Sequence, residues 1–324
     1  MSILIVGGAG YIGSHTAKLV AASGRTPVVF DNLSSGHRWA LKWGVFEEGD
    51  LGDRAAIDRV LERHQIEAVI DFAAHIEVGE SVRNPRKYFR NNLVNTLNLL
   101  DAMVDKGIKD IVFSSTAAVY GDPLTVPIPE DHRLLPVNPY GESKLFVERT
   151  LRWYGDAYGL RWSALRYFNA AGADPEGDIG EDHSPESHLI PLAIRAALGQ
   201  RGELQVFGAD YPTPDGTALR DYIHVVDLAG AHLLALAHLA AGKGSFAANI
   251  GIGQGHSVRQ VIETVEKVSG RAVPRREAAR RPGDAPALVA DARRATELLG
   301  FRPRYPDLTT IVEHAWKWHA SRTG

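Results

Sequence analysis

Residues 3–15 read ILIVGGAGYIGSH, a short apolar run that passes through three evenly spaced glycines, Gly7, Gly10 and Gly13, into a helical pattern. A glycine turn between a strand and a helix lets the backbone approach a bound anion, which the free N–H groups at the start of the helix then contact. The spacing is GxxGxxG rather than the more common GxGxxG, so taken alone it also fits an ordinary turn. The feature limits the N-terminal part of the chain to folds that begin with a strand and a following helix.

An acidic residue at the end of the second apolar run supports a nucleotide site at this turn. The run TPVVF (26–30) is followed by Asp31, and an acid about 20 residues beyond the glycines hydrogen-bonds the ribose of a bound dinucleotide. Asp31 would also repel a 2′-phosphate, so the sequence favours NAD over NADP. Asp50 in GDLGD (49–53) is a second candidate for a nucleotide contact, as a partner for the adenine amino group. The alternative is that Asp50 is a solvated turn residue.

Short apolar runs continue to alternate with helical patterns through the first half of the chain. The runs are ILIV (3–6), TPVVF (26–30), AVIDF (68–72), DIVFSS (110–115) and WSALRYF (162–168). Apolar runs without period-two alternation are typical of strands that are buried on both faces of a parallel sheet. The helical patterns between them therefore predict an α/β fold with a doubly wound parallel sheet of the Rossmann type.

The character of the sequence changes after about residue 170. The stretches NAAGADPEGDIGEDHSPESH (169–188) and GADYPTPDGTALRD (208–221) are rich in Gly, Pro and Asp, and long loops in a compact chain are usually functional. We predict an NAD-binding domain over residues 1–170 and a smaller, loop-rich substrate domain over 171–324. A helix and a strand near 222–252 are expected to pack onto the first domain.

Composition excludes several other classes of protein. The 324 residues carry a net charge of −3, which provides no electrostatic footprint for nucleic acid or for an acidic membrane. The absence of cysteine excludes disulfides and thiolate metal sites and fits a reducing compartment. The N-terminus lacks the features of a signal peptide. We expect a cytoplasmic protein with no membrane segment, no nucleic-acid partner and no metal site.

The stretch NPYGESK (138–144) predicts a catalytic tyrosine. Asn138 can cap a helix whose first position is Pro139, so that Tyr140 lies in the first turn and Lys144 lies one turn later on the same face. An ammonium group, the positive end of the helix and an oxidised nicotinamide ring would each lower the pKa of the phenol, which could then accept a proton from an alcohol. Upstream, IVFSSTAAVYG (111–121) ends in hydroxyls, with Thr116 best placed to hold that alcohol.

With these residues the sequence resembles the extended short-chain dehydrogenase/reductase family, and within it the UDP-sugar 4-epimerases. The resemblance covers nearly the whole chain and includes GGAGYIGSHT, FSSTAAVYG, PYGESK, RYFNAAGADPEG, DYPTPDGT and RDYIHVVDLA. By resemblance Tyr140 is the base, Lys144 its partner and Thr116 the hydroxyl at the sugar O4. The implied NAD contacts are Gly7, Gly10, Tyr11, Ile12, Gly13, Asp31, Asn32, Asp50, Leu51, Phe72, Ala73, Ala74, Asn91, Ser114, Tyr140, Lys144 and Tyr167. The implied UDP-sugar contacts are Thr116, Phe168, Asn169, His188, Leu189, Gln205, Val206, Phe207, Arg220, Arg281, Asp284 and Leu288.

The resemblance implies reversible inversion at C4 of a UDP-hexose, from UDP-galactose to UDP-glucose, through transient oxidation with bound NAD. UDP-N-acetylhexosamines are possible additional substrates, and UDP-xylose/UDP-arabinose is the alternative pair. A dehydratase is disfavoured, because Ala117 and Ala118 stand where those relatives carry carboxylates. A net oxidoreductase of the same family and a non-catalytic NAD-sensing protein are weaker alternatives.

Three positions depart from the pattern of the family. Ile76 replaces a lysine near the nicotinamide, His188 replaces an asparagine at the diphosphate, and Leu288 replaces a tyrosine beside C2 of the sugar in some relatives. The smaller Leu288 would leave room for an N-acetyl group. The resemblance also implies a homodimer, in which helices near 90–106 and 140–158 pack across a two-fold axis.

Overall fold

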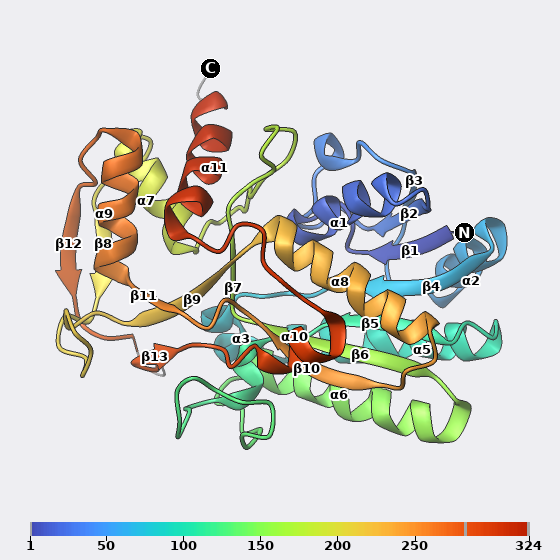
Figure 1. The fold of residues 1–324 in the computed structure, drawn as a ribbon. Coiled ribbons are helices and arrows are strands. Elements are labelled where there is room, and N and C mark those ends of the chain that lie inside the picture. The colour runs from blue at the N-terminus through green and yellow to red at the C-terminus, as the bar shows by residue number, and fades with distance from the viewer. Residues whose placement is uncertain (1, 282–283, 323–324) are drawn as a thin grey trace.

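A seven-stranded, wholly parallel sheet forms the centre of the computed structural model, which describes residues 2–281 and 284–322 (Figure 1). Its strand order is β10-β6-β5-β4-β1-β2-β3. The strands are β1 (Ser2–Val6), β2 (Thr26–Asp31), β3 (Val45–Glu48), β4 (Ile66–Asp71), β5 (Asp110–Ser114), β6 (Arg161–Tyr167) and β10 (Phe246–Ile250). The predicted doubly wound sheet is confirmed.

Helices cover both faces of this sheet, as the buried strands require. Alternate residues of β1 face opposite cores: Leu4 and Val6 pack in one, Ile3 and Ile5 in the other. The first core contains residues of α2 (Arg54–His64), α5 (Asn95–Asp105) and α6 (Pro139–Tyr158), whereas the second contains residues of α1 (Tyr11–Ala22), α8 (Val225–Ala240) and α10 (Arg293–Leu299). In Figure 1, α6 lies below the sheet and α8 above it.

The C-terminal half builds a second layer of structure beside the carboxyl ends of the strands. One small sheet contains β7 (Asn169–Ala171), β9 (Leu219–His224), β11 (Gly255–Ser257) and β13 (Ala287–Leu288), and a second pairs β8 (Leu204–Phe207) with β12 (Arg275–Ala278). Three helices, α7 (Leu189–Ala197), α9 (Val258–Ser269) and α11 (Leu308–Ser321), enclose a separate core with β8. These elements stand at the left of Figure 1.

A π-helical turn, η2 (Phe89–Val94), precedes α5, where the sequence predicts an ordinary helix from residue 93. The buried Asn92 lies in this turn. Its amide exchanges hydrogen bonds with the backbone N–H and C=O of His75 (2.8 and 3.0 Å) and donates to the Ser143 hydroxyl (3.1 Å). A local π-turn of this kind is frequent at functional sites, and here it ties the loop after β4 to α6.

The other short elements are η1 (Arg38–Ala40), α3 (Val78–Arg83), α4 (Pro85–Tyr88) and η3 (Ala117–Tyr120). Among the residues described, none of the helices combines the length and the apolar character needed to cross a membrane.

Candidate active site

Gly7 and Gly13 of the first turn leave no room for side chains, and a Cβ on Gly10 would lie 3.3 Å from the Gly7 carbonyl oxygen. Gly7 has φ +73° and its Cβ would lie 2.8 Å from the backbone nitrogen of Ala73, while a Cβ on Gly13 would lie 2.3 Å from the Gly7 carbonyl oxygen. The Gly10 N–H donates to that same oxygen (3.2 Å), and no side chain caps the start of α1. The turn therefore presents bare backbone N–H groups at a helix N-terminus, which fits the pyrophosphate of a dinucleotide.

The predicted ribose and adenine contacts gather at the carboxyl ends of β2 and β3. Asp31 is buried, and its two oxygens accept N–H groups of Ala9 (2.9 Å) and Leu33 (2.8 Å). Burial raises the pKa of Asp31, and these two hydrogen bonds lower it in part. Asn32 donates to the Asp50 carboxylate (2.5 Å), so both lie beside the glycine turn, with Leu51 buried behind them.

The predicted nicotinamide contacts lie at the ends of the three central strands. The Ser114 hydroxyl at the end of β5 is 2.8 Å from the Tyr167 phenol at the end of β6. Phe72, Ala73 and Ala74 follow β4 directly. The remaining predicted cofactor residues surround this region: the Tyr11 hydroxyl donates to the Gly172 carbonyl (2.7 Å), Ile12 packs against the core, and the Asn91 amide donates to Asn92 (3.0 Å).

Tyr140, Thr116 and Lys144 come together because α6 starts beside the end of β5. Asn138 accepts a hydrogen bond from the Gly141 N–H (2.9 Å), which caps α6 as predicted. The Thr116 side chain lies close enough to the Tyr140 phenol to lower its pKa. The buried Lys144 ammonium donates to the carbonyl of Ser114 (2.9 Å) and lies 4.6 Å from the centre of the Phe113 ring.

Gly141 allows this close approach. A Cβ there would lie 2.6 Å from the Ala118 carbonyl oxygen, so the start of α6 packs directly on the turn that follows Thr116. Thr116 accepts a hydrogen bond from the Ala118 N–H (3.1 Å), which leaves its own proton for the Tyr140 oxygen.

Burial opposes the predicted lowering of the Tyr140 pKa, which relies in part on the charge of an oxidised nicotinamide ring and stays a prediction. Burial raises this pKa well above its usual value, Tyr167 raises it further, and only the Thr116 hydrogen bond lowers it. Burial also lowers the pKa of Lys144 to about 8, against the opposing charges of Asp71 and Glu148. Spacing in the sequence identifies the charged neighbour of Tyr140, but it does not reveal how deeply both groups are buried.

A cavity of about 460 Å³ lies between the small sheets and α7. Among the residues predicted to bind the UDP-sugar, it is lined by Asn169, His188, Leu189, Gln205, Phe207, Arg220, Arg281 and Asp284. The Arg281 guanidinium stacks over the Phe207 ring (4.0 Å), and Arg220 lies 3.5 Å from an Asp284 oxygen. Two arginines in one cavity suit a diphosphate, which accepts charge-assisted hydrogen bonds.

Four predicted substrate residues, Thr116, Phe168, Val206 and Leu288, lie outside the lining of this cavity. The side chain of Val206 is buried in the core with α7 and α9, because successive residues of β8 point to opposite faces. Phe168 and Leu288 pack against a small apolar cluster that includes Ala117 and Tyr120, next to Thr116. Ile76 is exposed in the loop after β4.

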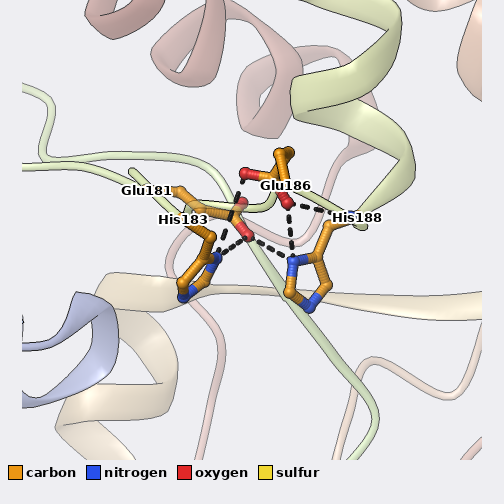
Figure 2. Close-up of side chains that lie close together, drawn as sticks. All are labelled: Glu181, His183, Glu186 and His188. Carbon is orange, nitrogen blue, oxygen red and sulfur yellow. Dashed lines mark hydrogen bonds and ion pairs between the residues drawn. The ribbon is translucent and has the colours of Figure 1, made fainter. Parts of the chain in front are cut away.

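Sequence reasoning missed the acidic partners of His188. Glu181 and Glu186 line the cavity and contact the His188 imidazole (2.8 and 3.0 Å), and His183 lies beside them (Figure 2). Burial lowers the pKa of His188, but the two carboxylates outweigh it and raise this pKa well above its usual value. The spacing E-x-H-x-x-E-x-H over residues 181–188 was the available signal.

Comparisons with known proteins agree with this geometry. The NAD dependent epimerase/dehydratase family matches residues 3–251. A UDP-glucose 4-epimerase of Rhizobium meliloti is 53% identical over 99% of this chain and 98% of its own length. The crystal structure of UDP-glucose 4-epimerase from Brucella ovis in complex with NAD superposes with a TM-score of 0.96 at 52% identity, covering 97% of both chains. The structure of the UDP-Glc/GlcNAc 4-epimerase from Campylobacter jejuni has a TM-score of 0.87 at 42% identity, covering 99% of both.

The glycine turn generates a test of cofactor binding. We expect Gly13→Ala to abolish the NAD that is retained through purification and to lower the melting temperature, because the new methyl group overlaps the Gly7 carbonyl. The matched control is Gly230→Ala in the middle of α8, where no atom lies within 4 Å. This control should stabilise the protein by about 0.5–1 kcal/mol. The NAD content of each protein is measured by releasing the cofactor with acid and quantifying it enzymatically. A full complement of NAD in Gly13→Ala would contradict the assignment.

Proposed function

Since the chain belongs to the NAD-dependent epimerase/dehydratase family and inverts C4 of a UDP-hexose with NAD, we propose that Tyr140, Thr116 and Lys144 carry this reaction. The observation that supports the assignment is the close packing of the start of α6 on the turn after Thr116, which places Tyr140 and Lys144 at the carboxyl end of the central sheet. That edge is where ligands of doubly wound sheets bind.

The bare glycine turn, Asp31 and the Asn32–Asp50 pair would hold the cofactor, and bound NAD supplies a hydride acceptor that returns the hydride to the other face of the sugar. Tyr140 takes the proton of the 4-hydroxyl and later gives it back. Thr116 donates a hydrogen bond to the phenol oxygen and thereby favours the phenolate. Lys144, one helical turn away, is the cation that this buried phenolate needs.

The large cavity would hold the UDP half of the substrate. In our proposal Arg220, Arg281 and His188 face the diphosphate, while Gln205 and Phe207 lie beside the uracil. Firm binding of this remote half would keep the oxidised intermediate on the protein while the sugar turns over. The cavity lining stops short of Tyr140, so the sugar itself would meet fewer fixed contacts.

Two further expectations from the sequence are kept as proposals. We place the boundary between the nucleotide and substrate domains near residue 170, with α8 and β10 in the first, because β10 pairs with β6 and α8 packs against the sheet. We also place the protein in the cytoplasm, because a chain without cysteine fits a reducing compartment.

The assignment of the base is tested by Tyr140→Phe. We expect kcat for UDP-galactose to fall about 10²–10⁴-fold, because general acid–base catalysis contributes that much, while bound NAD and the affinity for UDP stay unchanged. Coupled measurement of UDP-glucose formation gives the rate. The control is Tyr154→Phe on the same helix, whose phenol contacts only Asp101 at the surface and whose loss should leave kcat unchanged. Full turnover by Tyr140→Phe would show that another group is the base.

The breadth of the sugar pocket depends on Leu288. We propose that the protein also accepts the UDP-N-acetylhexosamine pair, because Leu288 packs beside the turn after Thr116 and is smaller than tyrosine. The Campylobacter jejuni neighbour is described as acting on both kinds of sugar. Leu288→Tyr should lower kcat/KM for UDP-N-acetylgalactosamine at least about tenfold, because excluding one group from a pocket is worth about 10–200-fold. The same substitution should lower kcat/KM for UDP-galactose much less.

Chromatography of nucleotide sugars measures both activities, and Leu288→Met, of similar volume, is the control. If the unchanged protein does not convert UDP-N-acetylgalactosamine, the proposal is wrong, and UDP-xylose is the next substrate to test.

The partner of the chain in solution would be a second copy. The exposed sides of η2 and α6 carry Val94, Phe146 and Trp153, and Trp153 is 63% exposed. Unpartnered apolar side chains on adjacent helices are typical of a protein interface. We expect a homodimer by light scattering and a monomer for Trp153→Glu. Leu124→Glu, on a loop where the side chain is 71% exposed, should stay dimeric. A monomeric parent protein would contradict this proposal.

A further inference from the structure

A cluster of four metal-ligating side chains lies in the loop between β7 and α7. Glu181, His183, Glu186 and His188 turn towards one another, and one donor atom from each lies within 4.8 Å of all the others (Figure 2). Glu181, Glu186 and His188 also line the large cavity. The cluster therefore stands on the wall of the cavity, where the Tyr11 ring of the glycine turn also contacts His183 (6.2 Å between ring centres).

The donor atoms already share one small space. The Nδ1 atoms of His183 and His188 lie 3.1 and 2.8 Å from the same oxygen of Glu181. His188 Nδ1 is 3.0 Å from one oxygen of Glu186, and His183 Nδ1 is 3.9 Å from the other. Ligands that share a zinc ion at about 2.0–2.2 Å lie roughly 3–4 Å apart, so a contraction of about 1 Å would bring all four onto one ion.

One oxygen of Glu186 has no hydrogen-bond partner. The Glu186 side chain is only 1% exposed, and its Oε2 atom is buried without a donor, whereas Oε1 accepts the N–H groups of Ser187 and His188. The nearest guanidinium, that of Arg195, lies 4.0 Å away. A buried carboxylate oxygen without a partner is costly, and here it faces the two imidazoles.

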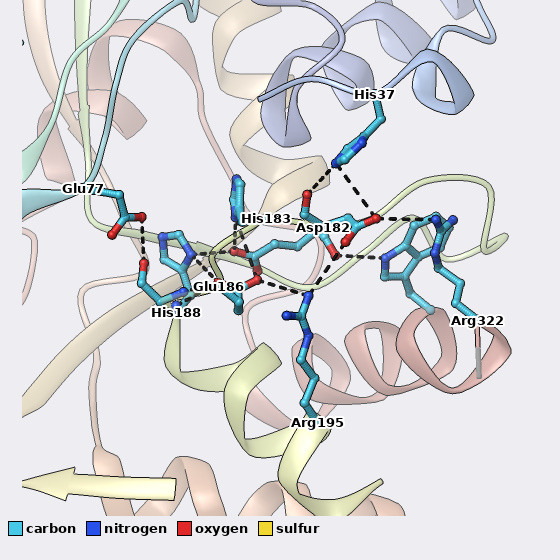
Figure 3. Close-up of polar contacts among 11 residues, drawn as sticks. His37, Glu77, Asp182, His183, Glu186, His188, Arg195 and Arg322 are labelled. Atoms are coloured by element: carbon cyan, nitrogen blue, oxygen red, sulfur yellow. Dashed lines mark hydrogen bonds and ion pairs between the residues drawn. The ribbon is translucent and has the colours of Figure 1, made fainter. Parts of the chain in front are cut away.

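The neighbouring carboxylate is neutralised by other cations. Asp182 points out of the cluster and has Arg195 and Arg322 near its oxygens (3.8 and 3.4 Å), as Figure 3 shows. Among the residues described, no lysine or arginine makes a hydrogen bond to the side chain of Glu181 or Glu186. Arg195 lies at nearly the same distance from Glu186 (4.0 Å) as from Asp182, so among the residues described the carboxylates inside the cluster differ from Asp182 in lacking a second guanidinium such as that of Arg322.

A second acidic cluster in the same loop already holds a cation that belongs to the protein itself. Asp174, Glu176 and Asp178 also lie within metal-binding distance of one another. The Lys18 ammonium lies among them, 2.9, 2.6 and 3.2 Å from their oxygens. The place of a cation is taken there by the protein itself, so we expect no metal at that cluster.

The backbone of the cluster is held in place from outside. The Glu181 carbonyl accepts the Trp318 indole N–H (3.1 Å) and the Asp182 carbonyl contacts His37 (2.7 Å). Ser187 donates to Glu77 in the loop after β4 (2.9 Å). Ligands on a fixed backbone lose little freedom when they bind an ion.

We propose that Glu181, His183, Glu186 and His188 bind one divalent transition-metal ion, with zinc as the ion that suits them best. Imidazole nitrogen with carboxylate oxygen selects zinc and similar ions over magnesium and calcium, which prefer oxygen alone. Two carboxylates and two neutral imidazoles balance the charge of the ion. This proposal replaces the sequence-based expectation that the protein has no metal site.

The ion would cancel the negative charge of Glu181 and Glu186 on the wall of the cavity. This second part rests on the proposed function, because it assumes that the cavity holds the diphosphate of the substrate. Metal and UDP should then strengthen one another's binding by the same factor, since coupling between two sites is reciprocal.

Zinc titration of the full-length protein tests the site. After dialysis against a chelator and return to metal-free buffer, competition with a chromophoric zinc indicator should give one tight site per chain, and an excess of Mg²⁺ should leave it unchanged. Glu186→Gln and His183→Asn should each weaken zinc binding at least about tenfold, because even groups that only support a ligand change affinity by 10–100-fold. Glu176→Gln, in the cluster around Lys18, is the matched control and should bind zinc like the parent.

The outcomes separate the two parts of the proposal. The metal site is overturned if the parent protein shows no one-to-one zinc site. It is also overturned if Glu186→Gln and His183→Asn bind zinc as tightly as the parent does. Circular-dichroism melting of each variant shows whether it is folded, and His183→Gln provides a second conservative variant if His183→Asn is not. If zinc binding is lost in these variants but saturating UDP does not change it in the parent protein, the metal site stands and its coupling to the cavity is refuted. Neither result depends on catalytic activity.

Discussion

A buried ion pair between Arg166 of β6 and Glu148 of α6 joins the elements that carry the proposed catalytic groups. Both side chains are 6% exposed, and the guanidinium donates to both carboxylate oxygens. Glu148 also accepts the Ser115 hydroxyl (2.5 Å), one residue before Thr116, and Arg166 donates to the Tyr120 hydroxyl (3.0 Å). A buried pair of this kind costs desolvation, and it holds only where further hydrogen bonds satisfy the remaining atoms. Here those bonds fix the turn after β5 against α6.

This network explains why the two halves of the site are built differently. Tyr140 and Lys144 stand on α6 and Thr116 on the short turn after β5, and these elements are linked through buried groups, so the relative positions of the three residues are set by the core. The cavity residues His188, Arg220 and Arg281 come instead from loops and strand ends of the second layer. A rigid reacting centre beside a loop-built binding cavity suits a reaction in which one half of the substrate is held and the other half turns.

Local sequence predicted those parts of the structure that depend on neighbours in the chain. The glycine turn, the cap at Asn138 and the face shared by Tyr140 and Lys144 all follow from spacings of a few residues. The depth of burial of a side chain and the conformation of a loop do not follow from such spacings. The burial that raises the pKa of Tyr140 depends on β5 and β6, and the inward Val206 follows from the register of β8 with β12. The cluster at 181–188 depends on contacts with α11 and His37, which no spacing in the sequence reveals.

The burial that opposes ionisation of Tyr140 also makes its ionisation depend on positive charge nearby. Burial raises the pKa of the phenol and lowers that of Lys144 to about 8, so each charged form is costly alone. Asp71, whose own pKa burial raises to about 6, helps to keep Lys144 charged. A phenolate at Tyr140 therefore needs positive charge close by, which Lys144 would supply in the proposed mechanism. An oxidised nicotinamide ring carries a second positive charge, whereas the reduced ring does not. The phenolate of Tyr140 is therefore more populated beside the oxidised ring. Loss of the ring's positive charge raises the pKa of the phenol, which matches the direction in which the proton must move in each half of the proposed reaction.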